Sequence, residues 1–437
     1  MHPTATHRAI EAVWRIESAK VVAGVTRVVR DLGVAEELAQ DALVAALETW
    51  PRSGVPDNPG AWLMATAKRR AIDHLRKRAL HRREEDELGR YLDDQFALSA
   101  PDVDAALDDA IGDDLLRLMF VACHPVLATQ ARVALTLKVV GGLSTDEIAR
   151  AFLVPEATIA QRIVRAKRTL AAASVAFEIP REFELAARLE SVLEVIYLVF
   201  NEGYAATAGN DWMRPALCDE SLRLGRILAE LAPAEPEVHG LVALMEIQAS
   251  RTRARSGPGG EPVLLLDQDR ARWDHLLIGR GLAALARAEA LDAGLGPYAL
   301  QASIAACHAR AHAAEATDWT RIAALYDALA QLTPSPVIEL NRAVACAMAF
   351  GPAAGLELAD TLRDAPQLIG YHLLPAVRGD LLEKLGQHAE ARAEFTRAAA
   401  LTRNARERAL LLARAAASPP DAGAEPERPP SPRHEST

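Results

Sequence analysis

The most informative part of this sequence is residues 144–170, which read STDEIARAFLVPEATIAQRIVRAKRTL. Ser144 and Glu147 have the spacing of a capping box, in which a serine at the helix N-cap and a glutamate three residues later exchange hydrogen bonds with backbone N–H groups. Pro155 then interrupts the helical pattern, and a second helix is expected from about Glu156. The segment therefore predicts a short helix, a tight turn and a longer helix.

The longer helix has two different faces. Its apolar positions recur at spacings of four, three and four, and they are Ile159, Ile163, Ala166 and Leu170. The opposite face is polar and basic, and it carries Thr158, Gln161, Arg162, Arg165 and Arg168, with Lys167 beside them. This combination is typical of a helix-turn-helix, whose second helix reads base edges and holds phosphates. An ordinary helical hairpin is the alternative, and the one-sided basic face favours DNA binding.

A second basic helix is predicted to begin after Asp57-Asn58, where Pro59 suits the first helical turn. Its expected apolar face consists of Trp62, Ala65, Ile72, Leu75 and Ala79. The other face is cationic, with Lys68, Arg69, Arg70, Arg76, Lys77 and Arg78, continued by Arg82 and Arg83. Such a face either lies along phosphates or is a solvated surface, and the charge alone does not separate the two. The preceding loop, residues 51–58, either holds an extruded base or simply joins two helices.

Composition limits the class of protein. The 437 residues carry a net charge of −10, so DNA contact has to come from local basic patches. The four cysteines, Cys123, Cys218, Cys307 and Cys346, are far apart and fit a reducing compartment without a zinc or disulfide framework. The sequence shows neither a signal peptide nor a run of ~20 apolar residues. We therefore expect a cytoplasmic protein that does not enter a membrane and needs no cofactor.

Charge and hydrophobic pattern divide the chain into five parts. Alanine, leucine, arginine and glutamate dominate and aromatic residues make up only 5%, which predicts an all-α fold. Two small helical modules, residues 1–83 and 114–177, flank an acidic connector at residues 84–113. An alanine- and leucine-rich helical region follows at residues 181–417, and a proline-rich tail at residues 418–437 is expected to be disordered.

The region 181–417 contains weak internal repeats. Residues 336–359 predict two helices joined at Gly351-Pro352, and residues 381–401 have the Leu-Gly, Ala, Phe order of a tetratricopeptide repeat. Earlier repeats, near residues 215–255 and 273–332, are degenerate. Paired helices that bury their faces only against the next pair predict a tetratricopeptide-like α-solenoid.

Taken together, residues 36–43 with Trp50, residues 61–78 and residues 158–170 resemble the extracytoplasmic-function (ECF) sigma factors of the sigma-70 family. The resemblance covers about the first 175 residues. It implies that the chain binds core RNA polymerase, at the β′ clamp and β flap, and directs promoter-specific initiation without being an enzyme. Ala160 and Met64 depart from the family pattern, which limits any statement about the promoter sequence.

The resemblance also implies roles for individual residues. The polymerase-binding residues would be Glu37, Leu38, Gln40, Asp41 and Leu43. The residues that contact the promoter −10 element would be Asp57, Asn58, Lys68, Arg69, Arg70, His74, Arg76, Lys77 and Arg78. The residues that contact the −35 element would be Thr158, Gln161, Arg162, Arg165, Lys167 and Arg168. The acidic connector would thread into the polymerase in place of a nucleic acid strand.

The C-terminal part resembles a subgroup of these factors with a fused tetratricopeptide-like domain, through residues 200–204, 267–274 and 340–343. The implied role is regulation, with a regulatory protein or ligand as a further partner. Asn201, Glu202 and Tyr204 would form an interdomain contact or a ligand site, unless Gly203 is a plain helix C-cap. Asp267, Asp269, Arg270 and Trp273 would form a binding site or a salt-bridge network. His308 and His312 lack an evident third ligand, so no metal site is expected.

Two other classes of protein remain open. A conventional helix-turn-helix regulator with a tetratricopeptide-like sensor would bind DNA without polymerase, but it would leave the polymerase-docking pattern unexplained. A scaffold without a DNA role would leave the basic face unexplained. The sequence contains no phosphate loop, nucleophile elbow or zinc signature, which argues against an enzyme.

Overall fold

The computed structural model describes residues 5–85, 107–152, 154–206, 210–291 and 294–417. As predicted, the fold is all-α, and the described residues contain only one isolated β-bridge, between Ser256 and Pro262. The chain divides into two compact units, the first made of residues 1–204 and 214–245 and the second of residues 205–213 and 246–437. The predicted tail, and most of the predicted acidic connector, lie outside the described residues.

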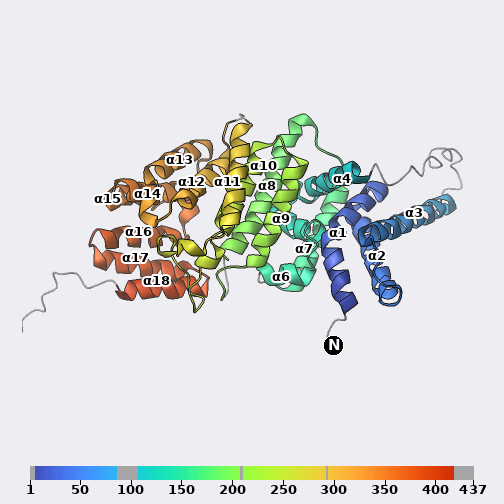
Figure 1. Cartoon of the computed structure of the whole chain (residues 1–437), viewed down its shortest axis with the longest axis horizontal. Helices are drawn as coiled ribbons and strands as arrows, with labels where there is room; N and C mark the ends of the chain where they lie inside the picture. Colours follow the sequence, from blue (N-terminus) through green and yellow to red (C-terminus); the bar gives the residue numbers. More distant parts are fainter. Residues whose placement is uncertain (1–4, 86–106, 153, 207–209, 292–293, 418–437) are drawn as a thin grey trace, which may run out of the picture. The chain divides into compact units, whose positions relative to one another are not determined.

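The first unit contains the helices of both predicted DNA-binding modules and the helices that follow them up to residue 245 (Figure 1). In chain order these helices are α1 (Ala5–Val29), α2 (Leu32–Ser53), α3 (Pro59–Glu85), α4 (Leu107–Ala122), α5 (Thr129–Val139), α6 (Thr145–Phe152), α7 (Glu156–Ala172), α8 (Glu182–Tyr204), α9 (Pro215–Leu231) and the larger part of α10 (Pro236–Ala249).

The helices α1, α2 and α3 pack against one another as a three-helix bundle. The starts of α2 and α3 follow from local capping. Asp31 accepts a hydrogen bond from the backbone N–H of Val34 at 3.0 Å, and Asn58 accepts one from Ala61 at 3.0 Å. A side-chain cap of this kind stabilises a helix by about 1 kcal/mol. The predicted start of α3 at Pro59 is confirmed.

The buried face of α3 differs from the predicted one. Leu63, Ala67 and Ala71 are fully buried, whereas Ile72 is 46% exposed. Ala65 and Ala79, also assigned to the core, are exposed as well. The buried face of α3 consists largely of alanines. A hydrophobic periodicity is dominated by large apolar residues, so it predicts the wrong face of this helix as buried. Trp62 is half-buried, and its ring meets Trp50 edge-on at 5.3 Å.

The helix-turn-helix is present as predicted in α6 and α7. The backbone N–H of Ser144 donates to Glu147 at 2.8 Å, and that of Glu147 donates to Ser144 Oγ at 3.1 Å, which confirms the capping box. The predicted core face of α7 is also confirmed, because its buried residues are Ile159, Ile163, Ala166 and Leu170. Burying each large aliphatic side chain contributes about 1.5–3 kcal/mol to stability.

The two units do not divide at the expected position near residue 180. Instead, α8 and α9 pack with α4 and α5 in the first unit. The reason lies in the composition of α8, where Val195, Ile196, Val199 and Phe200 are at most 1% exposed. A helix this apolar needs neighbours on more than one side, and α4, α5 and α9 supply them.

In the second unit each helix packs against the next one in sequence. The helices are α11 (His275–Ala290), α12 (Pro297–Arg310), α13 (Trp319–Leu332), α14 (Pro336–Phe350), α15 (Pro352–Thr361), α16 (Leu373–Lys384), α17 (His388–Leu401) and α18 (Ala405–Ala417). The predicted helix pair around Gly351 is present, and Gly386 makes the turn between α16 and α17 with a φ of 77°. Gly379 lies directly against the ring of Phe395, where a larger residue would clash.

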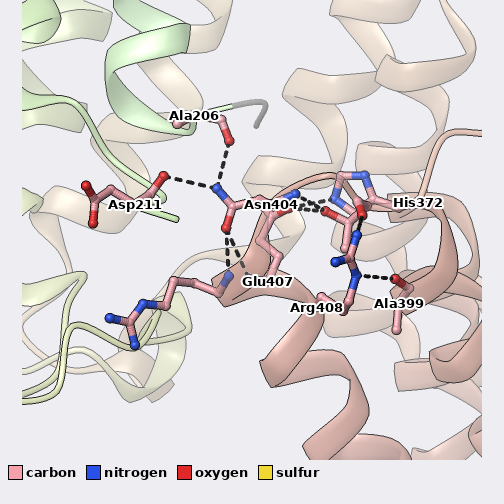
Figure 2. Close-up of polar contacts among 9 residues, drawn as sticks. Ala206, Asp211, His372, Ala399, Asn404, Glu407 and Arg408 are labelled. Carbon is pink, nitrogen blue, oxygen red and sulfur yellow. Dashed lines mark hydrogen bonds and ion pairs between the residues drawn. The ribbon is translucent and has the colours of Figure 1, made fainter. Parts of the chain in front are cut away.

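The last helix is tied to the segment at the start of the second unit (Figure 2). Asn404 is fully buried, and its side-chain N–H groups donate to the carbonyl oxygens of Ala206 at 3.2 Å and Asp211 at 3.1 Å. Its Oδ1 accepts from the backbone N–H groups of Arg406 and Glu407, which caps α18. One side chain therefore satisfies backbone groups almost 200 residues apart.

Candidate polymerase and promoter interfaces

The helix predicted to dock on polymerase, α2, presents a polar face to solvent. Glu37, Gln40 and Asp41 are exposed and Leu43 is half-buried. Leu38 is only 9% exposed and belongs to the bundle core, so it supports the helix from behind. The structure thus brings three of the five predicted polymerase-binding residues to one accessible face.

The cations of α3 are unequal in their accessibility. Arg69, Arg76, Lys77 and Arg78 are exposed, while Lys68, Arg70 and His74 are half-buried. Some of the exposed or half-buried cations already have acidic neighbours. Arg70 Nη1 lies 3.1 Å from Asp41 Oδ2, and Arg76 Nη1 lies 3.9 Å from Asp73 Oδ1. Asp57 is exposed at the start of this helix, and Asn58 is its cap. The side chains of Arg82 and Arg83 lie outside the described set.

Lys68 is half-buried and lies near Arg27 and Asp114. Burial lowers the pKa of its ammonium group, the nearby Arg27 lowers it further, and Asp114 partly compensates. Asp114, the first residue of the second predicted module, is itself only 3% exposed and forms ion pairs with Arg117 at 2.7 Å and Arg27 at 3.4 Å. It is a buried structural acid and not part of a solvated stretch.

On α7, three predicted −35 residues, Gln161, Arg165 and Arg168, are exposed on the side opposite the core face. Thr158 and Arg162 are partly exposed beside them. Within the described part of the chain, no ion pair engages Arg165 or Arg168. This face is therefore available to a polyanion.

Lys167 has a different position from the other predicted −35 residues. Its ammonium group is paired with Glu36 of α2, which is only 7% exposed. Lys138 of α5 lies on the other carboxylate oxygen of Glu36, at 3.7 Å. A second link joins the same two modules, from Arg15 of α1 to Glu147 of the capping box at 2.6 Å. Burial would raise the pKa of Glu147, but its bonds to Ser144 and Arg15 hold that pKa below the usual value.

The residues predicted as an interdomain or ligand site at 201–204 lie inside the first unit. Glu202 is 9% exposed and is paired with Arg214, whose guanidinium also donates to the carbonyl oxygen of Ala151 in α6. The Tyr204 ring stacks on Phe200 with centroids 5.6 Å apart. Asn201 forms a hydrogen bond with Tyr197, whose pKa burial raises.

Gly203 is not the helix C-cap that was considered, because α8 continues to Tyr204. A Cβ at this position would lie 2.7 Å from the backbone nitrogen of Cys218. The glycine is needed because α9 approaches α8 closely here.

The residues at 267–274 form a structural network in the second unit. Arg270 donates to the carbonyl oxygens of His308 at 2.5 Å and Ala311 at 2.9 Å, and it stacks on the ring of buried Trp273 at 4.5 Å. Asp269 caps the short helical turn at 270–272, and Asp274 caps α11. Asp267 is exposed. The contacts of Arg270 tie the end of α12 to the residues before α11 through backbone acceptors, whereas the sequence left a binding site and a salt-bridge network open.

The histidine pair gives no indication of a metal site. His308 is buried, and burial together with the charges of Arg251 and Arg270 lowers its pKa to about 4. His312 is exposed. The described residues contain no group of three or more His, Cys, Asp or Glu side chains placed to hold a metal ion.

Three parts of the chain match known family models. Residues 16–81 match the family model "Sigma-70 region 2", residues 117–170 match "Sigma-70, region 4", and residues 188–289 match a "Family of unknown function (DUF6596)". The "ECF RNA polymerase sigma factor SigK" of Mycobacterium sp. is 31% identical over 36% of this chain and 77% of its own length. The chain belongs to the ECF sigma factors.

Two further relatives show how far the similarity extends. The "Probable ECF RNA polymerase sigma factor SigI" of Mycobacterium tuberculosis is 27% identical over 44% of this sigma factor and 68% of its own length. The "Uncharacterized protein R00370" of Rhizobium meliloti is 46% identical over 88% of this sigma factor and 90% of its own length. The second alignment spans 386 residues, so it continues well into the C-terminal helices. No solved structure matches the chain.

Membership in this family carries a role in promoter-specific transcription, with binding to core RNA polymerase and promoter DNA. ECF sigma factors are initiation factors and not enzymes. In the part of the chain that the structure describes, no helix is long and apolar enough to cross a membrane.

Some residues of the interfaces were not found from the sequence. Glu36 lies beside predicted polymerase-binding residues but is turned inward to two lysines. Arg188, Arg214 and Arg223 bind backbone carbonyls of the helix-turn-helix module from outside it. Isolated arginines in an apolar helical sequence carry no local signal of such contacts.

Proposed function

We propose that this sigma factor binds core polymerase, at the β′ clamp and β flap, with the exposed face of α2 as its main contact. In the same proposal α3 contacts the −10 element, and the outer face of α7 contacts the −35 element. The observation that carries the proposal is the arrangement of α7. Its four core residues hold it against the module, while Gln161, Arg165 and Arg168 remain accessible.

The proposal includes a change at Lys167. This lysine is paired with buried Glu36, and phosphate contact would require the pair to separate. The pairs from Glu36 and Glu147 join the two modules, whereas a promoter presents its −10 and −35 elements well apart along the duplex. About 3.4 Å of helix axis separates consecutive base pairs on one strand. Binding both elements at once therefore favours a more open arrangement of the two modules.

We further propose that the tetratricopeptide-like C-terminal helices regulate initiation. The support is that α8 and α9, which begin the C-terminal region, share a compact unit with the helix-turn-helix module. Helices that belong to this unit can change the positions of α6 and α7 through direct packing contacts. A regulatory protein or ligand at the later helices is part of the same proposal.

Binding to core polymerase tests the main proposal. Full-length chain and bacterial core polymerase are mixed and separated by size, and the affinity is measured by fluorescence anisotropy. Replacing Glu37, Gln40 and Asp41 together by alanine is expected to weaken binding at least about tenfold, as for a central interface patch. Glu190→Ala, an exposed acid on α8, is the matched control and should leave the affinity unchanged.

The outcomes separate the competing functions. If the wild-type chain fails to bind core polymerase but binds DNA by itself, it acts as a conventional regulator. If the triple variant binds as tightly as the wild type, the assignment of α2 as the polymerase contact is wrong even though the family holds.

A further inference from the structure

The ends of three helices in the helix-turn-helix module are closed by side chains from α8, from α9 and from the residue directly before α9. Arg188 donates to the carbonyl oxygen of Phe120 at 2.8 Å, near the end of α4. Arg223 donates to Val140 at 3.0 Å, just after α5. Arg214 donates to Ala151, in the last turn of α6. All three donors lie outside residues 117–170, which match the region-4 model.

These contacts have a common physical basis. The last carbonyl groups of a helix have no partner within the helix, and they carry the negative end of its dipole. An arginine supplies both a hydrogen-bond donor and a positive charge at that point. Three arginines placed in this way hold the ends of α4, α5 and α6 in fixed positions.

Helix α6 is held at both ends. At its start, the capping-box residue Glu147 is paired with Arg15 of α1 at 2.6 Å. At its end, Arg214 binds Ala151, directly before the turn that leads through Pro155 into α7. Since α7 follows α6 after a tight turn, the position of α6 sets the direction in which α7 presents Arg165 and Arg168.

Arg214 is itself firmly placed. Its guanidinium is paired with Glu202, which is only 9% exposed, and its backbone N–H donates to the carbonyl oxygen of Gly203 at 2.7 Å. The residues directly before it, on the way from α8 to α9, belong to the second unit and have their described contacts within that unit. Asn404 binds Ala206 and Asp211, and Arg255 stacks on Trp212 at 4.3 Å (Figure 2 shows the contacts of Asn404).

We propose that Arg214 is a positioning residue for −35 recognition, and that the Asn404-anchored segment before it links the C-terminal helices to the helix-turn-helix. Arg214 acts through α6 and does not touch DNA itself. The C-terminal helices influence promoter recognition because Asn404 fixes the chain at Asp211, three residues before Arg214. This proposal rests on the proposed function, since it assigns the −35 contact to α7.

The test uses full-length chain with core polymerase and two templates. One is a promoter of this sigma factor, found by mapping transcript starts on genomic DNA. The other is the same promoter with its −35 element replaced. The readout is the ratio of initiation on the two templates, together with the affinity for core polymerase. The variants are Arg214→Ala, Arg214→Lys and Asn404→Ala, and Arg181→Ala, an exposed arginine before α8, is the matched control.

The proposal predicts that Arg214→Ala lowers the template ratio about tenfold, the effect of one lost hydrogen bond from a charged donor. The affinity of Arg214→Ala for core polymerase should stay the same. Arg214→Lys should keep part of the template ratio that Arg214→Ala loses. Asn404→Ala should lower the template ratio by less than Arg214→Ala does. Combining Asn404→Ala with Arg214→Ala should add little, since both act on one path. Arg181→Ala should match the wild type.

Other results would overturn the proposal. If Arg214→Ala leaves the template ratio unchanged, Arg214 is not a positioning residue. If Asn404→Ala leaves the template ratio unchanged, the proposed link to the C-terminal helices is wrong. A loss of core affinity equal to the loss of initiation shows general unfolding, and Arg223→Ala, at a more exposed arginine, then has to reproduce the selective effect or the proposal fails. If the wild type initiates on neither template, the proposed function itself is wrong.

Discussion

The two basic helices, α3 and α7, look alike in sequence but differ in the structure. Both carry cations on one side and apolar residues on the other. On α7 the buried residues are Ile159, Ile163, Ala166 and Leu170, as the spacing predicts. On α3 the buried residues are Leu63, Ala67 and Ala71, and the larger Ile72 is 46% exposed.

The charges differ in the same way. Arg165 and Arg168 of α7 are exposed and engaged in no ion pair within the described residues. Arg70 and Arg76 of α3 are paired with Asp41 and Asp73. A row of cations in a sequence therefore overestimates the positive charge that is available to bind DNA. The partners of each cation decide how much of it remains available.

The largest expected effect is on the free energy of unfolding, and it compares the apolar faces of α7 and α3. Ile163→Ala in α7 is expected to lower the free energy of unfolding by about 2–5 kcal/mol, because it removes a fully packed side chain. Ile72→Ala in α3 is expected to change it by no more than about 0.5 kcal/mol, because that side chain lies largely in solvent. Urea unfolding followed by circular dichroism measures both, and equal losses would contradict the described packing of α3.

This contrast explains how much of the fold was predictable. The capping box, Pro155 and large apolar residues at helical spacing define α6 and α7 locally, so the helix-turn-helix was predicted with its core. Alanine gives a weak periodic signal, so the core face of α3 was misplaced. The grouping of α8 and α9 with the first unit depends on long-range contacts, which no short segment encodes.

The second effect compares one lysine on each helix. Lys167→Met leaves buried Glu36 with one ion-pair partner, Lys138 at 3.7 Å, beside the hydrogen bond that Gln40 donates at 3.0 Å, and it is expected to destabilise the fold by about 1–3 kcal/mol. Lys68→Met is expected to raise the melting temperature slightly, because Lys68 is half-buried beside Arg27. Thermal unfolding at neutral pH measures both variants.

The pH dependence of the Lys68 effect gives a second check. The folded pKa of Lys68 is lowered from 10.5, so its charged form destabilises the folded state at neutral pH. That penalty is lost once the pH rises above the pKa that Lys68 has in the unfolded chain, because the lysine is then neutral in both the folded and the unfolded state. The advantage of Lys68→Met should therefore shrink near pH 10.5, and a constant advantage would show that charge is not its cause.

The third effect concerns DNA affinity. Arg165→Ala is expected to weaken promoter binding of the holoenzyme by about 1–3 kcal/mol and to reduce the slope of log affinity against log salt by about 1. Arg76→Ala is expected to do less, because Asp73 already shares its charge at 3.9 Å. Filter binding across a salt series distinguishes them. A larger effect at Arg76 than at Arg165 would reverse the comparison.

The smallest effect tests the pair between α2 and α3. Asp41→Asn removes the partner of Arg70, and because the two side chains are 55% and 40% exposed to solvent, the expected loss of stability is about 0–1 kcal/mol. The loss should fade in high salt, and urea unfolding at two salt concentrations measures it. A loss of several kcal/mol would mean that the pair is a structural part of the bundle.

The candidate site was predictable to a similar degree as the fold. Exposed residues such as Gln161, Arg165 and Arg168 follow from helical spacing once the core face is known. Lys167 stands in the same stretch, but its pairing with Glu36 could not be predicted, because that acid is more than 100 residues away in sequence. The same holds for Arg214, which pairs with Glu202 and also donates to the backbone carbonyl oxygen of Ala151, 63 residues away in sequence.

The central claim is that this chain is an initiation factor that acts only with polymerase. The most direct measurement maps transcript starts on genomic DNA with core polymerase, in the presence and absence of the full-length chain. The account predicts new starts preceded by a shared pair of −10 and −35 elements, and no promoter-specific binding by the chain alone. Specific binding by the chain alone, without any new transcript start, would contradict it.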